Sequence, residues 1–466
     1  MPHCLNALVP VRWHRRGKRR GTGQNAKPEQ SRSHSAINAT LTEKRLTTEA
    51  LVEVPSTYTA ASASGTSFDD AFRKTVDDAM AKANDVLRAL NVEIHDHPEI
   101  MWKEKHTHDV LTQFMDNQGG WTVTRYYLGL GTAWRAGWSS GKDGRVIGVN
   151  SEMDALPGIG HACGHNLIAM AGVAVAIAVR AAMEQHSLPG RIILLGTPAE
   201  ESLEGKVVLL KMGAYDEMDV CVMSHPAAGD AKDAVIGGSL AIQAVEVEYE
   251  GRTAHTAATP WQGINALDAA VLAYNAVSVL RQQINPDHRI HGIIEGRDWV
   301  PNVIPDYAKM QWLVRAPTGD EVSALVKRLV NCLEAAALAT ACTPDIKAGT
   351  LVQDLRSNFT MGREFARAIE QYGYTASLTM GIAMSASTDF GNVTYALPAI
   401  HPGYFIPAPL NSGNHTIGFT NAARTQEAHD RTLVVSSALA LTCLRVLTDD
   451  DFTAQIKDEF EQSRSK

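Results

Sequence analysis

The chain has 466 residues, of which 45% are hydrophobic and 20% are charged, and its formal net charge at pH 7 is −8. A chain of this length exceeds one ordinary hydrophobic core, so we expect two domains. The mildly acidic balance gives no reason to expect nucleic acid or an anionic membrane as a partner of the folded part. The six cysteines are scattered without short-spaced pairs. This argues against a disulfide framework and favours a reducing, cytoplasmic compartment.

The first 66 residues differ in composition from the rest. Basic residues cluster between positions 12 and 20 with no acid before Glu29, and a Ser/Thr/Ala-rich stretch follows. This composition predicts a disordered arm because it offers too little apolar surface to bury. A basic, acid-poor mitochondrial targeting segment is the alternative. No apolar run reaches the ~20 residues that span a bilayer, and we expect the longest run, residues 167–182, to be a buried helix.

The folded part begins with helical periodicity and continues as an α/β pattern. Apolar residues recur at helical spacing over residues 68–91, and a second helix is predicted to end near Asn117. Short apolar strands follow at residues 146–149, 192–195 and 220–223. Such strands, separated by helices, indicate a mostly parallel sheet covered on both faces. Their carboxyl ends meet at one edge, where open α/β sheets bind ligands.

Residues 242–351 have the pattern of a separate domain. Apolar residues alternate with glutamates over residues 245–250, which is the period of a strand with one solvated face. The elements predicted after it are helix, strand, strand, helix and strand, so the whole is a ferredoxin-like unit. We therefore expect a larger α/β domain formed by residues 67–241 and 352–450, with a small α+β domain inserted between these two segments.

Side chains that could bind a metal follow the apolar strands. Cys163 and His165 stand two residues apart between glycines, and sulfur with imidazole nitrogen suits zinc or a related ion. By itself this motif fits a buried cysteine beside capping histidines equally well. Glu200 and Glu201 follow the second strand, where one carboxylate could bind metal while the other takes a proton from water. A solvated acidic turn is the alternative for this pair.

Further candidates come from other parts of the chain. His225 follows the third strand, and His415 lies in a loop rich in Gly and Asn. Both are plausible imidazole ligands, although a lone histidine in such a place is usually structural. Asp154 could orient a metal-bound histidine from behind. The convergence of three strands on one edge favours a metal site over any of these motifs taken alone.

Several ordered motifs resemble those of a known family. They are Glu152-Met153-Asp154-Ala155-Leu156-Pro157, His161-Ala162-Cys163-Gly164-His165-Asn166, Pro198-Ala199-Glu200-Glu201, Gly251-Arg252-Thr253-Ala254-His255, residues 263–269, Asn302-Val303-Ile304-Pro305-Asp306 and Ser387-Thr388-Asp389-Phe390-Gly391-Asn392. Over roughly residues 70–447 the chain resembles metallopeptidase family 20, the dinuclear family of aminoacylases, hippurate hydrolases and aminobenzoyl-glutamate hydrolases. The resemblance implies a di-metal α/β catalytic domain with an inserted ferredoxin-like lid, through which such enzymes often form homodimers.

The resemblance also implies a role for each matching residue. Glu200 corresponds to the general base that takes a proton from a metal-bound water, and Asp154 to the aspartate that supports the metal site. His255 corresponds to a histidine that binds the oxyanion, reaching across from the partner subunit in dimeric members. Asn302 and Arg315 correspond to lid residues that contact the substrate carboxylate. Two divalent ions, zinc or manganese, are expected on ligands from five positions: Cys163, His165, Glu201, His225 and His415.

Two positions depart from the family pattern. Most amidohydrolase relatives have aspartate where this chain has Asn166, which favours the dipeptidase and aminobenzoyl-glutamate hydrolase branch over the auxin-conjugate hydrolases. Ser202-Leu203-Glu204 interrupts a glycine run that usually follows the paired glutamates, which leaves the pocket shape and the substrate open.

The sequence therefore predicts a metal-dependent amidohydrolase or dipeptidase that cleaves the amide bond of a small N-acyl amino acid or dipeptide. The alternative is a non-catalytic binding or scaffold protein that retains the fold. The presence of every expected ligand together with the base favours the enzyme.

Overall fold

The computed structural model describes residues 66–202 and 204–464, so the predicted N-terminal arm lies outside it. The first described element is helix α1 (Thr66–Asp96), which confirms the helix predicted from periodicity and extends it by about two turns, mostly at its carboxyl end. Its apolar residues Phe72, Val76 and Met80 are buried at helical spacing. Residues 97–104 connect α1 to α2 (Lys105–Asn117).

The catalytic domain is built on a six-stranded mixed sheet with the order β1-β2-β4-β3-β5-β13. Strands β4, β3, β5 and β13 are parallel, while β2 pairs antiparallel with β4 and β1 antiparallel with β2. Because β3 is buried along its whole length, it is covered on both faces. The mostly parallel central sheet is therefore confirmed. Its strands are β1 (Thr122–Arg125), β2 (Trp134–Ser139), β3 (Val146–Glu152), β4 (Arg191–Thr197), β5 (Val220–Val222) and β13 (Ala399–Ile400).

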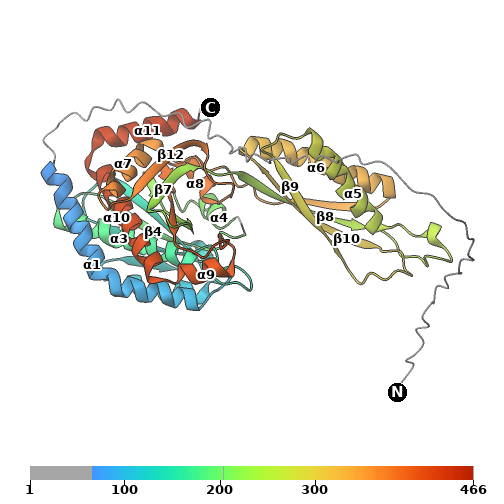
Figure 1. Cartoon of the computed structure of the whole chain (residues 1–466), viewed down its shortest axis with the longest axis horizontal. Coiled ribbons are helices and arrows are strands. Elements are labelled where there is room, and N and C mark those ends of the chain that lie inside the picture. The colour runs from blue at the N-terminus through green and yellow to red at the C-terminus, as the bar shows by residue number, and fades with distance from the viewer. Residues whose placement is uncertain (1–65, 203, 465–466) are drawn as a thin grey trace, which may run out of the picture. The chain divides into compact units, whose positions relative to one another are not determined.

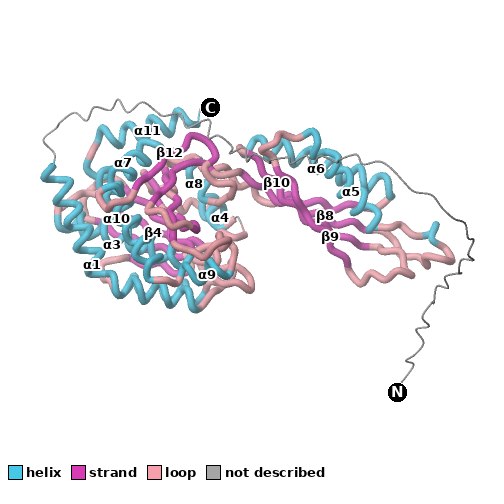
Figure 2. The backbone as a smooth tube through the Cα atoms, in the orientation of Figure 1, coloured by secondary structure: helices cyan, strands magenta, loops and turns pink. Residues whose placement is uncertain are grey.

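Helices α3 (His165–Gln185) and α10 (Gln426–Thr448) lie in the core of this domain (Figures 1 and 2). Both are long and apolar enough to cross a membrane, but 83% and 72% of their most apolar windows are buried inside the protein. A Cβ at Gly172 would lie 2.6 Å from the carbonyl oxygen of Asn150, so glycine allows α3 to approach β3 closely. The run at residues 167–182 is therefore a buried core helix, as predicted.

A second sheet of four short strands was not predicted. Its order is β12-β7-β14-β6, and it has both parallel and antiparallel pairs. His225 begins strand β6, so it lies shortly after β5 and on the edge of this second sheet. The strands are β6 (His225–Ala228), β7 (Asp233–Gly238), β12 (Thr375–Ile382) and β14 (Gly403–Ile406).

The remaining helices of this domain pack against the two sheets or against other helices. Helix α11 was not predicted, because its sequence is polar overall and its buried stripe is short, with Phe452, Ile456 and Phe460 as its large apolar residues. These helices are α4 (Gly205–Lys211), α7 (Phe359–Glu370), α8 (Phe390–Ala396), α9 (Ile417–Ala423) and α11 (Asp450–Arg464).

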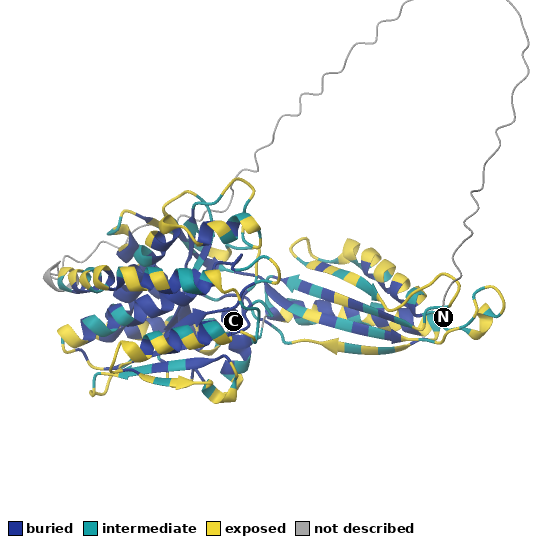
Figure 3. Cartoon of the chain, turned by 90° about the horizontal axis from the view of Figure 1, so that it is seen from below, coloured by how far each residue is buried: buried dark blue, intermediate teal, exposed yellow. Residues whose placement is uncertain are grey.

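The inserted domain has the predicted order of elements. Its antiparallel sheet has the order β11-β8-β10-β9, and α5 and α6 lie along one face of it (Figure 1). Buried and more exposed residues alternate along β8, as its glutamate pattern predicted (Figure 3). The last strand begins earlier than predicted, because Thr343 already pairs with Glu250. The elements are β8 (Ala241–Glu250), α5 (Ala266–Leu280), β9 (Arg289–Gly296), β10 (Tyr307–Ala316), α6 (Gly319–Thr340) and β11 (Thr343–Ala348).

Candidate metal centre and active site

Asp154 organises the carboxyl edge of the catalytic sheet. It follows β3 closely and is buried. Its Oδ1 accepts hydrogen bonds from Nδ1 of His165 at 3.1 Å and from the main-chain N–H of Glu200 at 3.1 Å. Its Oδ2 accepts the main-chain N–H of Glu201 at 2.9 Å. One carboxylate thereby orients His165, leaving Nε2 available for a metal, and positions the paired glutamates.

Two overlapping groups of potential ligands lie beside Asp154. Cys163, His165 and His225 each offer a ligand atom, and these atoms lie within 4.8 Å of one another. Cys163, Glu201 and His415 form a second such group. Cys163 belongs to both groups, so its sulfur would be available to an ion held by either of them. The five residues expected to be metal ligands therefore lie together.

The chemistry of these side chains fits divalent cations. Nε2 of His165 and Oε1 of Glu201 are buried and have no hydrogen-bond partner among the described residues, an arrangement that is costly unless a ligand completes it. Burial lowers the pKa of His225 to about 4, which keeps its imidazole neutral and able to donate a lone pair. Burial raises the pKa of the Cys163 thiol to about 12, so a nearby cation is needed to favour the thiolate that binds metal.

Glu200 is buried next to these ligands. Its Oε2 lies 3.8 Å from Nε2 of His165. Burial, reinforced by the carboxylates of Glu152 and Asp389, raises the pKa of Glu200 well above its ordinary value. A carboxyl group of this kind can accept a proton at neutral pH and give it back.

Lys206 is a buried cation near Glu200. The sequence analysis assigned no role to this lysine. Its Nζ lies 2.6 Å from Oε1 of Glu152 and 2.5 Å from Oδ1 of Asp389. Burial opposes the ionisation of Glu152, but the ammonium of Lys206 and the imidazoles of His165 and His225 together outweigh burial and lower the pKa of Glu152 to about 2. Removal of any one of these three side chains would leave an unpaired charge in the interior, which is strongly destabilising. Their ion pairs therefore anchor α4 to β3 and to the start of α8.

One pocket of about 660 Å³ contains Glu200 and reaches the ligands Cys163, Glu201, His225 and His415. Its size is ordinary for a small-molecule site. Arg315, from β10 of the inserted domain, also lines it. The Nη1 of Arg315 donates to Oγ of Ser387 at 2.8 Å, and no ion pair joins Arg315 to a carboxylate within the described part of the chain. Burial lowers the pKa of Arg315, and its guanidinium suits a substrate carboxylate.

His255 and Asn302 are not among the residues that line this pocket. Both are exposed. Nδ1 of His255 accepts the main-chain N–H groups of Ala257 and Ala258, each at 3.2 Å. Of the three lid residues expected to meet the substrate, a single chain thus brings only Arg315 to the pocket.

The two departures from the family pattern also lie away from the pocket lining. Asn166 is buried, and its Nδ2 donates to Oδ1 of Asn91 at 2.6 Å, which ties α3 to α1. Ser202 donates to the carbonyl of Ala199 at 2.9 Å, and Glu204 accepts Nε1–H of Trp102 at 3.1 Å. Asn166 therefore acts on helix packing. Ser202 braces its own loop, and Glu204 ties that loop to the α1–α2 connector.

Sequence reasoning missed Glu104, which braces the paired glutamates from the connector. Ala199, directly before them, has a left-handed φ of 59°, which is unfavourable for a residue with a Cβ. Oε1 of the buried Glu104 accepts its main-chain N–H at 2.9 Å. The same oxygen accepts the N–H of Trp102 at 3.0 Å, and Oε2 accepts the hydroxyl of Thr132 at 2.8 Å. No local sequence pattern announces a contact between residues 95 positions apart.

His401 also lines the pocket, and the sequence analysis assigned it no role. Its ring lies 5.7 Å from that of His225, centroid to centroid. It is buried, and neither ring nitrogen has a hydrogen-bond partner among the described residues. His161, the first residue of the motif that contains Cys163, is buried as well and belongs to neither ligand group.

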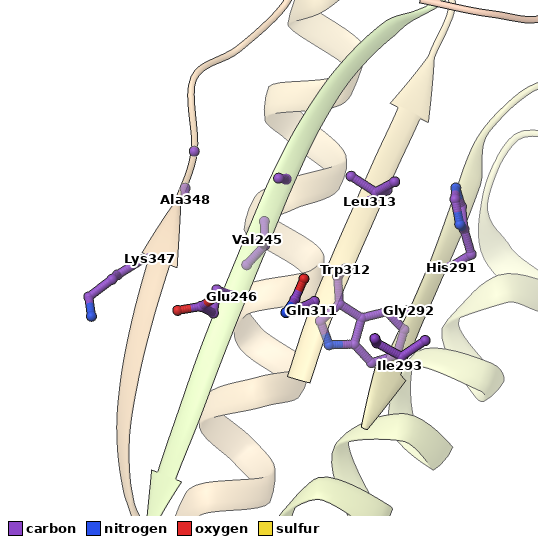
Figure 4. Close-up of a pocket in the computed structure, with 12 residues that line it drawn as sticks. Val245, Glu246, His291, Gly292, Ile293, Gln311, Trp312, Leu313, Lys347 and Ala348 are labelled. Carbon is purple, nitrogen blue, oxygen red and sulfur yellow. The ribbon is translucent and has the colours of Figure 1, made fainter. Parts of the chain in front are cut away.

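A second hollow lies on the open face of the inserted domain's sheet (Figure 4). Its lining includes Glu246, His291, Trp312 and Lys347. Figure 4 shows the charged side chains of Glu246 and Lys347 apart from His291, with Gln311 and Trp312 between them. Because it lacks a convergent set of acid, base and ligand groups, the candidate active site is the pocket around Glu200.

Comparisons with known proteins bear on this site. Residues 240–341 match the model of the peptidase dimerisation domain of the M20 family. The Xaa-Arg dipeptidase of Homo sapiens is 40% identical, over 82% of this chain and 90% of that protein. The chain belongs to the M20 family of metallopeptidases. A p-aminobenzoyl-glutamate hydrolase polypeptide from Escherichia coli (strain K12) is 26% identical over 83% of this chain and 94% of that protein.

Solved M20 structures share the fold. The aminobenzoyl-glutamate utilization protein of Klebsiella pneumoniae superposes with a TM-score of 0.65 at 16% identity, covering 80% of this chain and 99% of that one. A dinuclear metal-binding M20 peptidase from Bacillus subtilis gives 0.57 at 18% identity, covering 81% and 99%. The chain is thus a metal-dependent M20 hydrolase whose inserted domain is a peptidase dimerisation domain, and the predicted family is confirmed.

Proposed function

We propose that this M20 hydrolase cleaves the amide bond of a dipeptide or another small N-acyl amino acid, with Glu200 as its general base. The observation that carries the proposal is the position of the buried Glu200 beside two ligand groups that share Cys163. Arg315 lines the same pocket and supplies a fixed positive charge. Since all of these groups occur together, an enzyme is favoured over a non-catalytic scaffold.

The metal ligands are proposed to be Cys163, His165, Glu201, His225 and His415, with zinc or manganese as the ions. Two such ions would polarise the scissile carbonyl and lower the pKa of a water molecule. Glu200 takes the proton from the attacking water and returns it to the leaving amine. Asp154 holds Glu200 and His165 in the orientation that this transfer needs.

The substrate is proposed to be held by its free carboxylate. The guanidinium of Arg315 can form paired hydrogen bonds with a carboxylate, and its contact with Ser387 fixes its position. The relative from Homo sapiens is a dipeptidase named for a second residue of arginine. Dipeptides that end in arginine are therefore the first substrates to test.

His255 and Asn302 are proposed to act across a homodimer formed through the dimerisation domain. Both are exposed, and the main-chain N–H of Thr256 donates to the carbonyl of Asn302 at 3.3 Å, so the two residues lie on adjoining segments. In this proposal, His255 of one chain would donate to the oxyanion in the pocket of the other.

We also propose a cytoplasmic location, which the scattered cysteines favour.

The experiment is hydrolysis of a panel of dipeptides and acyl amino acids by the purified protein and by Glu200→Gln. Loss of a general base lowers kcat by about 10²–10⁴-fold. Metal content should stay that of the wild type, because Glu200 belongs to neither group that shares Cys163. Glu204→Gln is the matched control: its amide oxygen can still accept from Trp102, so it should keep normal turnover. Near-normal turnover by Glu200→Gln would remove the proposed base.

A further inference from the structure

A second kind of ligand cluster lies outside the active site. The described residues contain five groups of three side chains that could hold one ion, and four of them include Cys163 or Glu200. The fifth consists of Glu93, His97 and His106. We propose that Glu93, His97 and His106 form a separate divalent-cation site of the zinc class on the surface of the catalytic domain.

The three side chains come from the two ends of the α1–α2 connector. Glu93 lies in the last turn of α1, His97 follows its end, and His106 is in the first turn of α2. Oε1 of Glu93 lies 2.9 Å from Nε2 of His106, and the two imidazole rings are 4.4 Å apart, centroid to centroid. Zinc bonds of ~2.0–2.1 Å to nitrogen and oxygen place tetrahedral ligands about 3.3 Å apart. Small side-chain movements therefore complete this set.

The surroundings of the ligands favour binding. Nδ1 of His97 lies 2.9 Å from the main-chain oxygen of Glu93. The same Nδ1 lies 3.3 Å from Oε1 of Glu93, so an ion held between Glu93 and His97 would take this nitrogen as its ligand in place of the main-chain contact. The main-chain N–H of His106 donates to Oε1 of Glu99 at 3.0 Å, which fixes the start of α2. Both histidines therefore stand on backbone that is already held in place.

Access and ligand number also fit a zinc-class ion. The side chains of Glu93, His97 and His106 are 45%, 52% and 38% exposed. An ion can reach them from solvent, and a water molecule can fill the fourth position of a tetrahedral site. Two neutral imidazoles with one carboxylate are a ligand set that zinc and its neighbours prefer over magnesium or calcium.

An ion at this site would cross-link the ends of the connector that supports the active site. The carbonyl of Glu99 accepts the main-chain N–H of Ala155, the residue after Asp154, at 2.7 Å. Glu104, at the other end of the connector, holds Ala199. Because the ion joins the flanks of this segment, zinc binding should raise the melting temperature of the protein in addition to any effect of the catalytic ions.

The test is equilibrium dialysis of the full-length protein against buffered zinc chloride, followed by elemental analysis. The wild type should bind one zinc equivalent more than His97→Gln/His106→Gln. The control His288→Gln/His291→Gln, in the dimerisation domain, should bind as much as the wild type. His97→Cys should keep the extra equivalent, because a thiolate replaces the imidazole as ligand. Equal zinc content in the wild type and the His97/His106 double variant would overturn the proposal.

Further measurements separate this site from the catalytic centre. Cys163→Ser, which should lose catalytic metal, should keep the zinc equivalent that depends on His97 and His106. The double variant should retain dipeptide hydrolysis. As zinc is added, the melting temperature of the wild type should rise further than that of the double variant, because only the wild type fills the extra site. If the double variant does not fold, Glu93→Gln serves in its place. Unchanged zinc content in a folded Glu93→Gln, together with an unchanged response of its melting temperature, would also refute the site.

Discussion

Glu104 is the point at which the connector holds the catalytic loop, and its replacement by alanine should damage both stability and turnover. The substitution leaves the main-chain N–H groups of Ala199 and Trp102 without the carboxylate that accepts them. The buried N–H of Ala199 costs about 1–3 kcal/mol when it loses its acceptor, and the half-buried N–H of Trp102 adds a smaller penalty because water can reach it. Ala199 and Trp102 also have left-handed backbone, with φ of 59° and 61°, which the lost hydrogen bonds help to maintain.

The same substitution should lower kcat. Ala199 directly precedes Glu200 and Glu201, so relaxation of its φ moves the base relative to the metal ligands. A displacement of about 1 Å in a catalytic group can reduce the rate ~10²-fold. Glu104→Gln is the matched control, because its amide oxygen can still accept both N–H groups. We expect Glu104→Gln to stay within severalfold of the wild-type kcat.

The pH dependence of stability gives a second readout of Glu104. Burial raises the pKa of Glu104 to about 7 in the folded protein, above its ordinary value of 4.5. The folded state therefore holds this proton more strongly, and the resulting stability is present below about pH 4.5 and is lost as the pH rises through about 7. A difference of this size corresponds to ~3 kcal/mol. Because Gln does not titrate, Glu104→Gln should gain stability relative to the wild type between pH 5 and pH 8.

The assays are thermal unfolding of chelator-treated protein across this pH range and steady-state kinetics of the metal-loaded enzyme. The reasoning is refuted if Glu104→Ala matches the wild type in melting temperature and kcat. It also fails if Glu104→Gln loses as much turnover as the alanine variant, because the hydrogen bonds would then not be the cause.

Two further predictions concern the metals and the substrate. Cys163→Ser should reduce the binding of both catalytic ions, because only Cys163 belongs to both ligand groups. His225→Ala and His415→Ala should each weaken the binding of mainly one ion. Metal analysis of the three variants tests this, and equal metal losses in all three would show that the sulfur does not bridge. Arg315→Met should raise KM for a dipeptide by about 10–100-fold, because it removes a charged hydrogen bond worth ~1.5–3 kcal/mol. Its effect on kcat should be smaller. A dipeptide with an amidated carboxyl end should be insensitive to this substitution, and equal sensitivity of both substrates would contradict a carboxylate contact.

The sequence by itself determined the elements whose residues carry a regular pattern. The continuous apolar strands around Val149 and Leu194 fit only central strands, and the alternation along Val245–Glu250 fits only a strand with one solvated face. The pairing of the candidate ligands Cys163 and His165 is also local, since Cys163 directly precedes the cap of helix α3 and His165 begins that helix. Polar residues follow the carboxyl ends of β3, β4 and β5 in the sequence, and this was enough to place those residues on one edge of the sheet.

Tertiary structure decided what depends on contacts between distant segments. In the second sheet, β6, β7 and β14 are short and have no alternating pattern, so pairing defines them, whereas the apolar alternation along β12 was a signal that sequence reasoning did not use. Lys206 became a buried cation only because folding placed it between Glu152 and Asp389, and Glu104 became a brace only because α2 starts beside Ala199. Such partners are chosen by packing in three dimensions, for which a single sequence carries no spacing signal.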